Sequence, residues 1–197
     1  MKRKYLVLIS GCVAALIMFQ PAGFASAPVL AITEVRAAAV ARLQDVNGVA
    51  AGTVSFTQVN ANVIVVAHVV GLPPGFHGFH IHAVGLCDPT GETPFASAGP
   101  HHNPGGHQHA DHAGDLPSLL VLETGAGDLT AVTDRFSVAE LLDSDGSAVI
   151  IHANADNFAN IPERYGVPDE QTLATGDSGG RIACGVVQPA AEADSEK

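Results

Sequence analysis

Histidine is concentrated in one part of this 197-residue chain, because eight of its ten histidines lie between His77 and His112. Imidazole nitrogens are frequent ligands of copper and zinc. A cluster of this density indicates either a tract that collects metal loosely or a specific metal site. The spacing of the individual residues bears on which interpretation holds.

The first candidate pair is His80 and His82, which are separated by Ile81. On a β-strand, residues two apart point to the same face, so the two imidazoles would be neighbours while Ile81 enters the core on the other face. Such a pair suits copper or zinc. Two surface histidines often have the same spacing, so the pair alone is a weak signal.

A second candidate group contains His109, His112 and Asp115 at three-residue steps. One further ligand would complete the tetrahedral coordination that zinc prefers. The alternative is a solvated histidine-rich loop, although a loosely binding tract usually lacks strict spacing. His152 ends the apolar run 148–151, where a histidine is more often a core residue than a ligand unless other ligands join it.

Eight short runs with strand-like patterns must position these residues: 37–46, 49–59, 63–70, 76–84, 116–124, 128–138, 147–153 and 181–187. Turn signals such as Asn47-Gly48 separate them, which favours an all-β sandwich or closed barrel. Two long irregular stretches, 85–115 and 154–180, interrupt the pattern. Loops of this length in a compact domain are usually functional, and both begin near histidines.

Residues 1–27 have the pattern of a cleaved export signal: a basic start, an apolar run over 5–19 and a small-residue tail. The alternatives are a permanent membrane anchor and a lipoprotein site with a lipid on Cys12. We expect 28–35 to be a lead-in, 36–188 to form one domain and 189–197 to be a disordered tail.

The chain without its signal is strongly acidic. It holds six Lys and Arg against 20 Asp and Glu, a formal net charge of −14. This charge argues against nucleic acid and anionic membrane surfaces as partners. Cys87 and Cys184 remain as an even pair, which in an exported chain predicts one disulfide. Two separate buried thiols are the alternative.

Five motifs, in this order, resemble the copper/zinc superoxide dismutase family: GFHGFHIH, SAGPHHNP, HAGDLP, VIIHANADN and GDSGGRIACGVV. The resemblance extends from Arg36 to Gln188. It implies an eight-stranded Greek-key β-barrel, sandwich-like in architecture, with two long functional loops.

The resemblance also implies a site. Copper would be bound by His80, His82, His101 and His152, and zinc by His101, His109, His112 and Asp115, so that His101 bridges both metals. The family pattern further matches a disulfide between Cys87 and Cys184, an active-site arginine at Arg181, and a carboxylate at Asp156 that orients ligands of both metals. Spacing from the Asn-Pro of HHNP favours His109 over His107, and His102 and His107 have no assigned role.

The implied activity is conversion of superoxide to dioxygen and hydrogen peroxide by a histidine-bound copper that cycles between Cu(II) and Cu(I), beside a structural zinc. The alternative is a non-enzymatic copper/zinc buffer or chaperone on the same fold. We expect an exported bacterial protein that is periplasmic, secreted or at the cell surface. A homodimer and a lipid anchor through Cys12 are states that the sequence leaves open.

Overall fold

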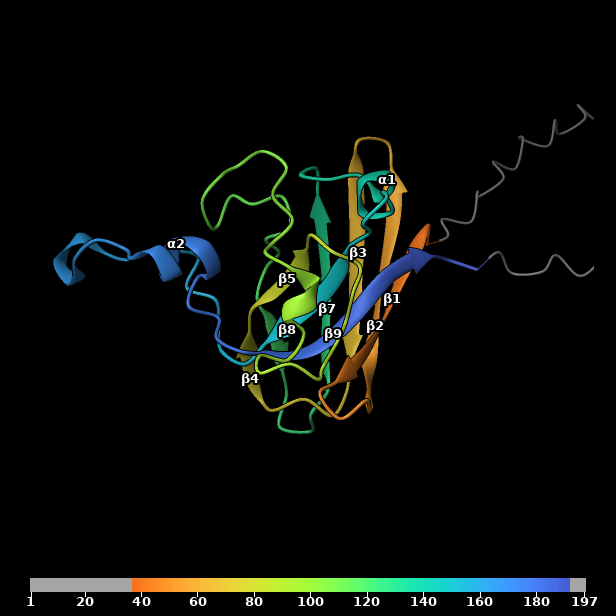
Figure 1. Cartoon of the computed structure of the whole chain (residues 1–197), viewed down its shortest axis with the longest axis horizontal. Helices are drawn as coiled ribbons and strands as arrows, with labels where there is room; N and C mark the ends of the chain where they lie inside the picture. The colour runs from red at the N-terminus through yellow and green to blue at the C-terminus, as the bar shows by residue number, and fades with distance from the viewer. Residues whose placement is uncertain (1–36, 192–197) are drawn as a thin grey trace, which may run out of the picture. The chain divides into compact units, whose positions relative to one another are not determined.

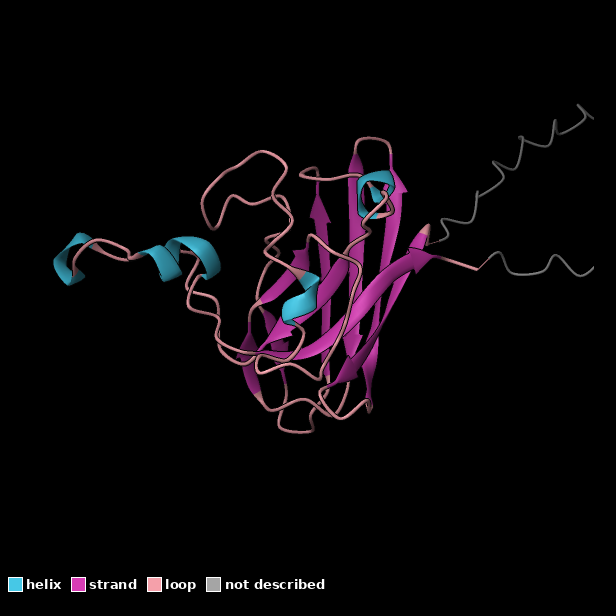
Figure 2. Cartoon of the chain, viewed as in Figure 1, coloured by secondary structure: helices cyan, strands magenta, loops and turns pink. Residues whose placement is uncertain are grey.

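Short strands dominate the computed structural model, which describes residues 37–191 (Figure 2). The strands of this part of the chain are β1 (Ala39–Asp45), β2 (Ala50–Val59), β3 (Asn62–Val69), β4 (Gly75–His77), β5 (Phe79–His82), β6 (Leu119–Val121), β7 (Gly127–Thr133), β8 (Ala148–His152) and β9 (Arg181–Pro189). The helical segments are short: η1 (Ala96–Ala98), α1 (Val138–Leu141), η2 (Glu163–Tyr165) and α2 (Glu170–Thr175).

Seven antiparallel strands form one sheet in the order β5-β8-β9-β1-β2-β3-β7, and β4 and β6 form a second, two-stranded sheet (Figure 1). The small sheet links the two edges of the large one, because β4 continues into β5 after Gly78 and a tight turn joins β6 to β7. The predicted all-β Greek-key barrel is confirmed. The predicted run 76–84 is divided at Gly78 into β4 and β5, and several other strands differ from the predicted runs in where they begin or end.

The main core lies inside the curled sheet and follows the period of two that the sequence shows. Along β3, the buried residues Val63, Val65, Ala67 and Val69 alternate with more exposed ones. The rings of Phe56 and Phe136 meet edge to face, with their centroids 6.5 Å apart. Alternation of this kind is expected where one face of a strand meets the core and the other meets solvent.

Strand β8 is buried on both faces, because a second layer covers its outer side. There, Phe95 and Ala98 from the first long loop pack with Ala148, Ile150 and Cys184 in a separate small cluster. The backbone of the same loop hydrogen-bonds to β5, which is the edge of the large sheet. The backbone N–H of Ile81 donates to the Gly114 carbonyl (2.9 Å), and the backbone N–H of His102 donates to the Ile81 carbonyl (2.8 Å). This loop therefore protects an edge that would otherwise be open to other strands.

The second long loop, predicted to be irregular, contains η2 and α2, and Figure 1 shows α2 lying beyond the edge of the sheet. Strand β7 ends at Thr133, earlier than the predicted run 128–138, because Ser137 and Glu140 form a capping box that begins α1. At the other end, β9 runs to Pro189 and Ala190 donates to the Ala38 carbonyl (3.0 Å).

The predicted export signal at 1–27, the lead-in at 28–35 and Cys12 lie outside the described residues, as do residues 192–197 of the predicted tail 189–197. The first residue of that predicted tail, Pro189, belongs to β9. Within 37–191, no helix has the length and apolar character needed to cross a membrane.

The predicted disulfide between Cys87 and Cys184 is present, with the two Cα atoms 5.7 Å apart. It ties the start of the first long loop to β9 across a sequence separation of 97 residues. Because Cys184 belongs to the small outer cluster, this bond also fixes the loop against that cluster.

We expect the double substitution Cys87→Ala and Cys184→Ala to lower the free energy of unfolding by about 4–5 kcal/mol, the chain-entropy value for a loop of this length. Urea denaturation of the variant and of the wild type would measure the difference. Reduced wild-type protein should show a similar loss. A loss below about 1 kcal/mol would show that this cross-link does not stabilise the fold in the way that the entropic account requires.

Candidate metal centre

Strand β5 places His80 and His82 on the outer face of the barrel, beneath the first long loop. Both side chains are buried, while the intervening Ile81 lies in the main core. The backbone of the loop lies directly beside β5, where His82 pairs with His101 and His80 with Asp115 in isolated bridges. Ligand candidates that are distant in sequence are therefore brought together along one strand edge.

His152 joins this group from the end of β8. Antiparallel pairing aligns His80 with Ile150 and His82 with Ala148, so the alternating residues of β8 share the face of the two histidines. The β8–β9 register shifts between Ile151 and His152, and the last pair joins His152 to Arg181. Irregularities of this kind commonly re-aim a side chain next to a functional site.

Four histidines offer one nitrogen each to a common point: the ligand atoms of His80, His82, His101 and His152 all lie within 4.8 Å of one another, and all four side chains are buried. Fixed acceptors hold the other nitrogen of three of these rings. His82 Nδ1 donates to the Gly99 carbonyl (2.8 Å) and His152 Nδ1 donates to the Gly179 carbonyl (3.0 Å). His80 Nε2 donates to the Asp156 carboxylate (2.7 Å).

These acceptors decide where the lone pairs point. A neutral imidazole that donates from one nitrogen has a lone pair on the other, so Nε2 of His82 and Nε2 of His152 face each other at 3.4 Å as two acceptors. His80 Nδ1 and His101 Nε2 are buried and form no hydrogen bond. Buried polar atoms without a partner are unfavourable, and a metal cation at this point would satisfy all four.

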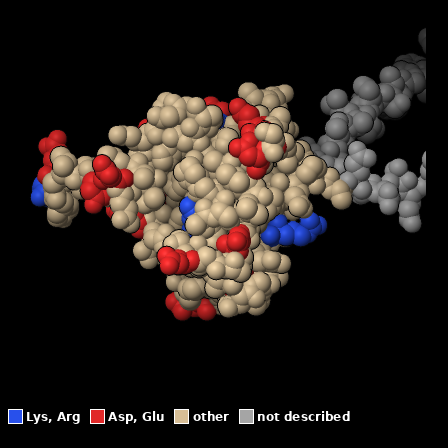
Figure 3. All heavy atoms as spheres, in the orientation of Figure 1, with Lys and Arg blue, Asp and Glu red and all other residues tan. Residues whose placement is uncertain are grey.

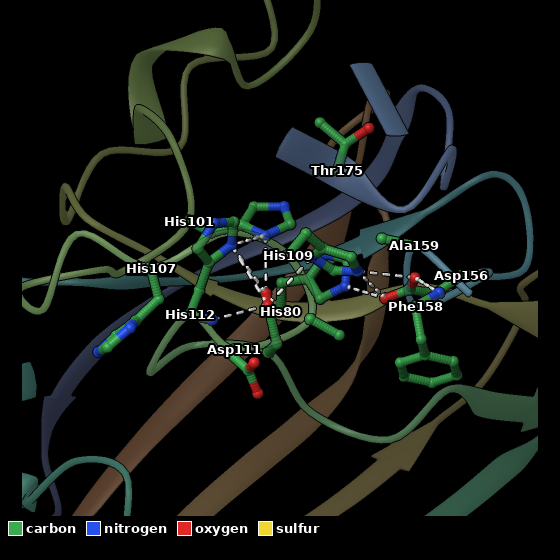
Figure 4. Close-up of polar contacts among 12 residues, drawn as sticks. His80, His101, His107, His109, Asp111, His112, Asp156, Phe158, Ala159 and Thr175 are labelled. Carbon is green, nitrogen blue, oxygen red and sulfur yellow. Dashed lines mark hydrogen bonds and ion pairs between the residues drawn. The ribbon is translucent and has the colours of Figure 1, made fainter. Parts of the chain in front are cut away.

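A second group gathers around Asp115. Its carboxylate lies 2.8 Å from His101 Nδ1, 3.0 Å from His109 Nδ1 and 3.2 Å from His112 Nδ1. A set of four ligand atoms within 4.8 Å of one another contains His80, His101, His109 and Asp115, and His112 is not in it. His112 nevertheless lies beside this set, because its Nδ1 is 3.2 Å from His101 Nδ1. Figure 4 shows these rings turned toward one another.

Asp156 joins the two groups from the loop that follows β8. Its carboxylate accepts hydrogen bonds from His80 Nε2 (2.7 Å) and His109 Nε2 (2.8 Å), and also from the backbone N–H of Phe158 (2.7 Å). Outer partners of this type fix the orientation of ligating imidazoles. Gly176, the C-cap of α2, lies directly against this carboxylate.

The remaining histidines lie outside these groups. His107 is exposed and points away from the cluster (Figure 4), with its backbone held by Asn103. His102 is half-buried, and its Nε2 has no hydrogen-bond partner. His77 is buried between the carbonyls of His152 and Pro73, and His68 forms an exposed pair with Asp128. The structure thus brings His109 into the centre and leaves His107 outside it.

Arg181 lies at the mouth of the first group. Its guanidinium donates to the carbonyls of Phe95 and Gly99, the latter at 2.7 Å. Gly99 therefore holds both Arg181 and His82 through one carbonyl. A cavity of about 270 Å³ opens here, lined by His82, Thr93, Pro100, His101, His152, Ala174, Thr175, Gly179, Gly180 and Arg181.

Burial determines the protonation of the first group. It lowers the pKa of His80 to about 4, despite the hydrogen bond to Asp156, and it lowers the pKa of His152 to about 3, with repulsion from His80 as the next cause. Burial also acts to lower the pKa of His109, but hydrogen bonds with Asp115 and Asp156 outweigh it and raise that pKa to about 9. Without metal, His80 and His152 are neutral at pH 7 while His109 carries a proton.

Sequence reasoning found the ligand candidates but not the groups that hold them. The carbonyls of Gly99 and Gly179 orient two histidines, and Gly176 leaves room for Asp156. The two carbonyls left no sequence signal, since a backbone acceptor is present at every position. The glycines within GDSGG were visible, but their contacts were not.

Substitution of Gly176 by alanine should disturb both groups at once. At this position φ is +59°, and a Cβ would lie 1.9 Å from Asp156 Oδ1 and 2.5 Å from His109 Nε2. Displacement of Asp156 should lower metal affinity by about 10–100-fold, the usual loss for an outer partner of a ligand. Metal titration against a competing chelator would measure it.

Gly106→Ala is the matched control, because Gly106 has φ +65° but nothing within 4 Å of the added carbon. Both variants share the backbone strain of a left-handed alanine, about 1–2 kcal/mol. Equal metal affinities in the two variants would contradict the steric argument.

The metal-free protein should lose stability as the pH falls from about 6.5 to about 4. In this range the unfolded chain protonates its histidines, whereas the folded chain keeps His80 and His152 neutral. Each such ring contributes a slope of about 1.4 kcal/mol per pH unit. Above pH 6.5, His109 has the opposite effect, and its contribution is lost as the pH rises through about 9.

Urea denaturation of chelator-treated protein at several pH values would test this, together with NMR titration of the histidine ring protons. His152→Ala should reduce the slope below pH 6.5. Titration of His80 and His152 near pH 6.5 would contradict the assignment of neutral rings.

The amino-acid sequence is similar to those of known proteins. The copper/zinc superoxide dismutase (SODC) family model matches residues 50–187. Over 163 residues, the chain is 45% identical to "Superoxide dismutase [Cu-Zn]" of Mycolicibacterium paratuberculosis, covering 76% of this chain and 67% of the relative. It is 46% identical to the proteins of the same name from Mycobacterium bovis and Mycobacterium tuberculosis, of which it spans 64%.

Solved structures are similar as well. The clock protein EA4 matches with a TM-score of 0.63 and 32% identity, over 77% of this chain and 94% of that one. A SOD-like protein from Bacillus subtilis matches with a TM-score of 0.62 and 31% identity, over 75% and 96% of the two chains. Two converging ligand groups, the matched region and the curated relatives lead to one conclusion: the chain is a member of the copper/zinc superoxide dismutase family, oxidoreductases that use copper and zinc.

Proposed function

We propose that this protein dismutates superoxide to dioxygen and hydrogen peroxide at the site described above. One observation carries the proposal: His101 belongs to both groups of ligand candidates, with Nε2 buried without a partner and Nδ1 beside Asp115. A single imidazole that presents one nitrogen to each group is suited to link a redox metal to a second, fixed metal.

The proposed copper ligands are His80, His82, His101 and His152, and the proposed zinc ligands are His101, His109, His112 and Asp115. Two neutral nitrogens with inward lone pairs, on His82 and His152, support the first set. His80 occurs in both groups of ligand candidates, and we assign it to copper because its Nδ1 is buried without a hydrogen-bond partner and because His112 beside Asp115 can complete the zinc set. When bound, copper supplies one-electron oxidation and reduction, and zinc supplies a redox-silent charge that holds His101.

Arg181 is proposed to bind the anion. Its guanidinium is fixed by two loop carbonyls and lines the same cavity as His82, His101 and His152. A permanently charged fork of donors beside the redox group can orient a small anion without reorganisation. His101 lines the same cavity, and when its Nε2 is not bound to copper, that nitrogen could hold a proton that the peroxide product takes up.

The charge of the domain opposes an anionic substrate. The described residues hold four arginines, no lysine and many acidic residues, and acidic side chains are spread over the face in Figure 3. Of the basic residues, Arg164 is the one in the second long loop, where its guanidinium stacks 4.6 Å from the Tyr165 ring centroid. Attraction of superoxide would therefore rest mainly on Arg181 and the bound metal cations.

We further propose that the protein is exported by a bacterium, through cleavage of residues 1–27. The disulfide supports an oxidising compartment, and the three curated relatives named above are bacterial. Mass measurement of the native N-terminus distinguishes cleavage after Ala27 from lipidation at Cys12. Sedimentation analysis distinguishes a monomer from a homodimer.

A dismutation assay on protein reconstituted with copper and zinc tests the proposal. We expect activity in the wild type and a loss of about 100-fold or more in His152→Ala, because removal of a ligand should exceed the 10–100-fold loss for outer partners. His107→Ala should retain full activity, since His107 is exposed and outside the cluster. An inactive, fully metallated wild type would instead support a copper/zinc buffer or chaperone.

A further inference from the structure

The segment from His109 to Asp115, here called the zinc loop, places three proposed zinc ligands within seven residues. Backbone hydrogen bonds hold its two ends to the rest of the domain. The backbone N–H of His109 donates to the Leu173 carbonyl (2.9 Å), and that of Gly114 donates to the His102 carbonyl (2.8 Å). Between these ties, Asp111 is exposed while the neighbouring His112 is buried. Inside this segment, the backbone N–H of Asp111 donates to the Gln108 carbonyl (2.8 Å) and that of His112 to the Asp115 carboxylate (3.0 Å), so further support from outside has to reach the carbonyls of the loop.

Arg135 supplies such support. It follows the end of β7, where its backbone N–H bonds to the Thr133 hydroxyl (3.2 Å). Its Nη1 donates to the carbonyls of Ala110 (2.8 Å) and His112 (3.3 Å), which lie on either side of Asp111. Its Nη2 lies 3.4 Å from the Asp111 carboxylate.

We propose that Arg135 is a positioning residue for zinc: it holds the backbone of the zinc loop at Ala110 and His112, so that the His112 ring stays against Asp115. This inference rests on the proposed zinc ligands. Both bonds come from Nη1, whose two N–H groups the planar guanidinium holds in fixed directions, whereas the N–H groups of an ammonium rotate on a flexible stem. Zinc retention should depend on that double contact.

The ion pair with Asp111 is not the important contact. Asp111 is 81% exposed and points away from the cluster in Figure 4, and its oxygen is 3.4 Å from Nη2. Exposed pairs of this kind contribute little, about 0–1 kcal/mol. Removal of the Asp111 carboxylate should therefore leave zinc retention nearly unchanged, which separates this contact from the two carbonyl contacts.

A purely electrostatic role for Arg135 predicts the opposite sign. A guanidinium close to a zinc site repels the bound cation, so loss of its charge would strengthen zinc retention. If Arg135 acts by positioning, loss of its side chain weakens retention. The direction of the change therefore decides between the two effects.

The experiment uses the full chain loaded with copper and zinc, and measures the rate at which zinc is released to a coloured chelator. We expect release to be about tenfold faster in Arg135→Gln, the lower end of the loss for outer partners of a ligand. Arg135→Lys should fall between this variant and the wild type, and Asp111→Asn should stay within about twofold of the wild type. The absorption spectrum of Co²⁺ at the zinc position should change in Arg135→Gln.

A merely structural role is tested by urea denaturation of the metal-free proteins. If the Arg135→Gln variant is less stable but releases zinc at the wild-type rate, the inference is overturned. Slower release of zinc by this variant than by the wild type would also overturn it. Should Arg135→Gln fail to fold, Arg135→Lys decides by the same two measurements. Wild type that binds zinc but does not dismutate superoxide would overturn the proposed function alone, whereas wild type that binds no zinc would overturn the inference as well.

Discussion

The buried carboxylate of Asp156 is the constraint on which the arrangement of the site depends. It accepts one hydrogen bond from His80 and one from His109, so it connects the two groups of ligand candidates. A carboxylate can only accept, so each ring turns its Nδ1 inward. Burial alone would raise the pKa of Asp156, but the hydrogen bonds from His109 and His80 outweigh this effect and lower it.

The barrel places the site on its outer surface, beneath the loops. Strand β5 lies at the edge of the large sheet, and the first long loop pairs with it as an additional strand would. A small apolar cluster and the disulfide then hold this loop against β8 and β9. Burial of the histidines follows from this second layer, and the low pKa values of His80 and His152 follow from that burial.

The acidic charge of the domain has two opposing consequences. A negative field favours retention of metal cations and disfavours approach of an anion. Arg181 offsets the repulsion of an anion locally, because it lines the same cavity as three of the histidines and the carbonyls of Phe95 and Gly99 fix its direction. The arginine is thus positioned by the same loop that covers the ligands.

Much of the fold could be predicted from sequence because strands leave local patterns. The period of two along β3 and the spacing of His80 and His82 are visible in a few residues. Boundaries were less predictable: β7 ends at Thr133 because a capping box nearby begins α1. The division of the predicted run 76–84 at Gly78 likewise follows from pairing with two different partners, since β4 pairs with β6 and β5 with β8.

The sequence by itself determined the succession of strands along the chain, the pair of cysteines and the family motifs that contain the ligand candidates. Tertiary structure alone decided which nitrogen of each ring faces inward, since the carbonyls of Gly99 and Gly179 that set this lie far along the chain from the rings they hold. It also decided the contacts of Arg135 and Gly176. Interactions between distant segments depend on how the chain folds back on itself, and they leave no periodic pattern in the sequence.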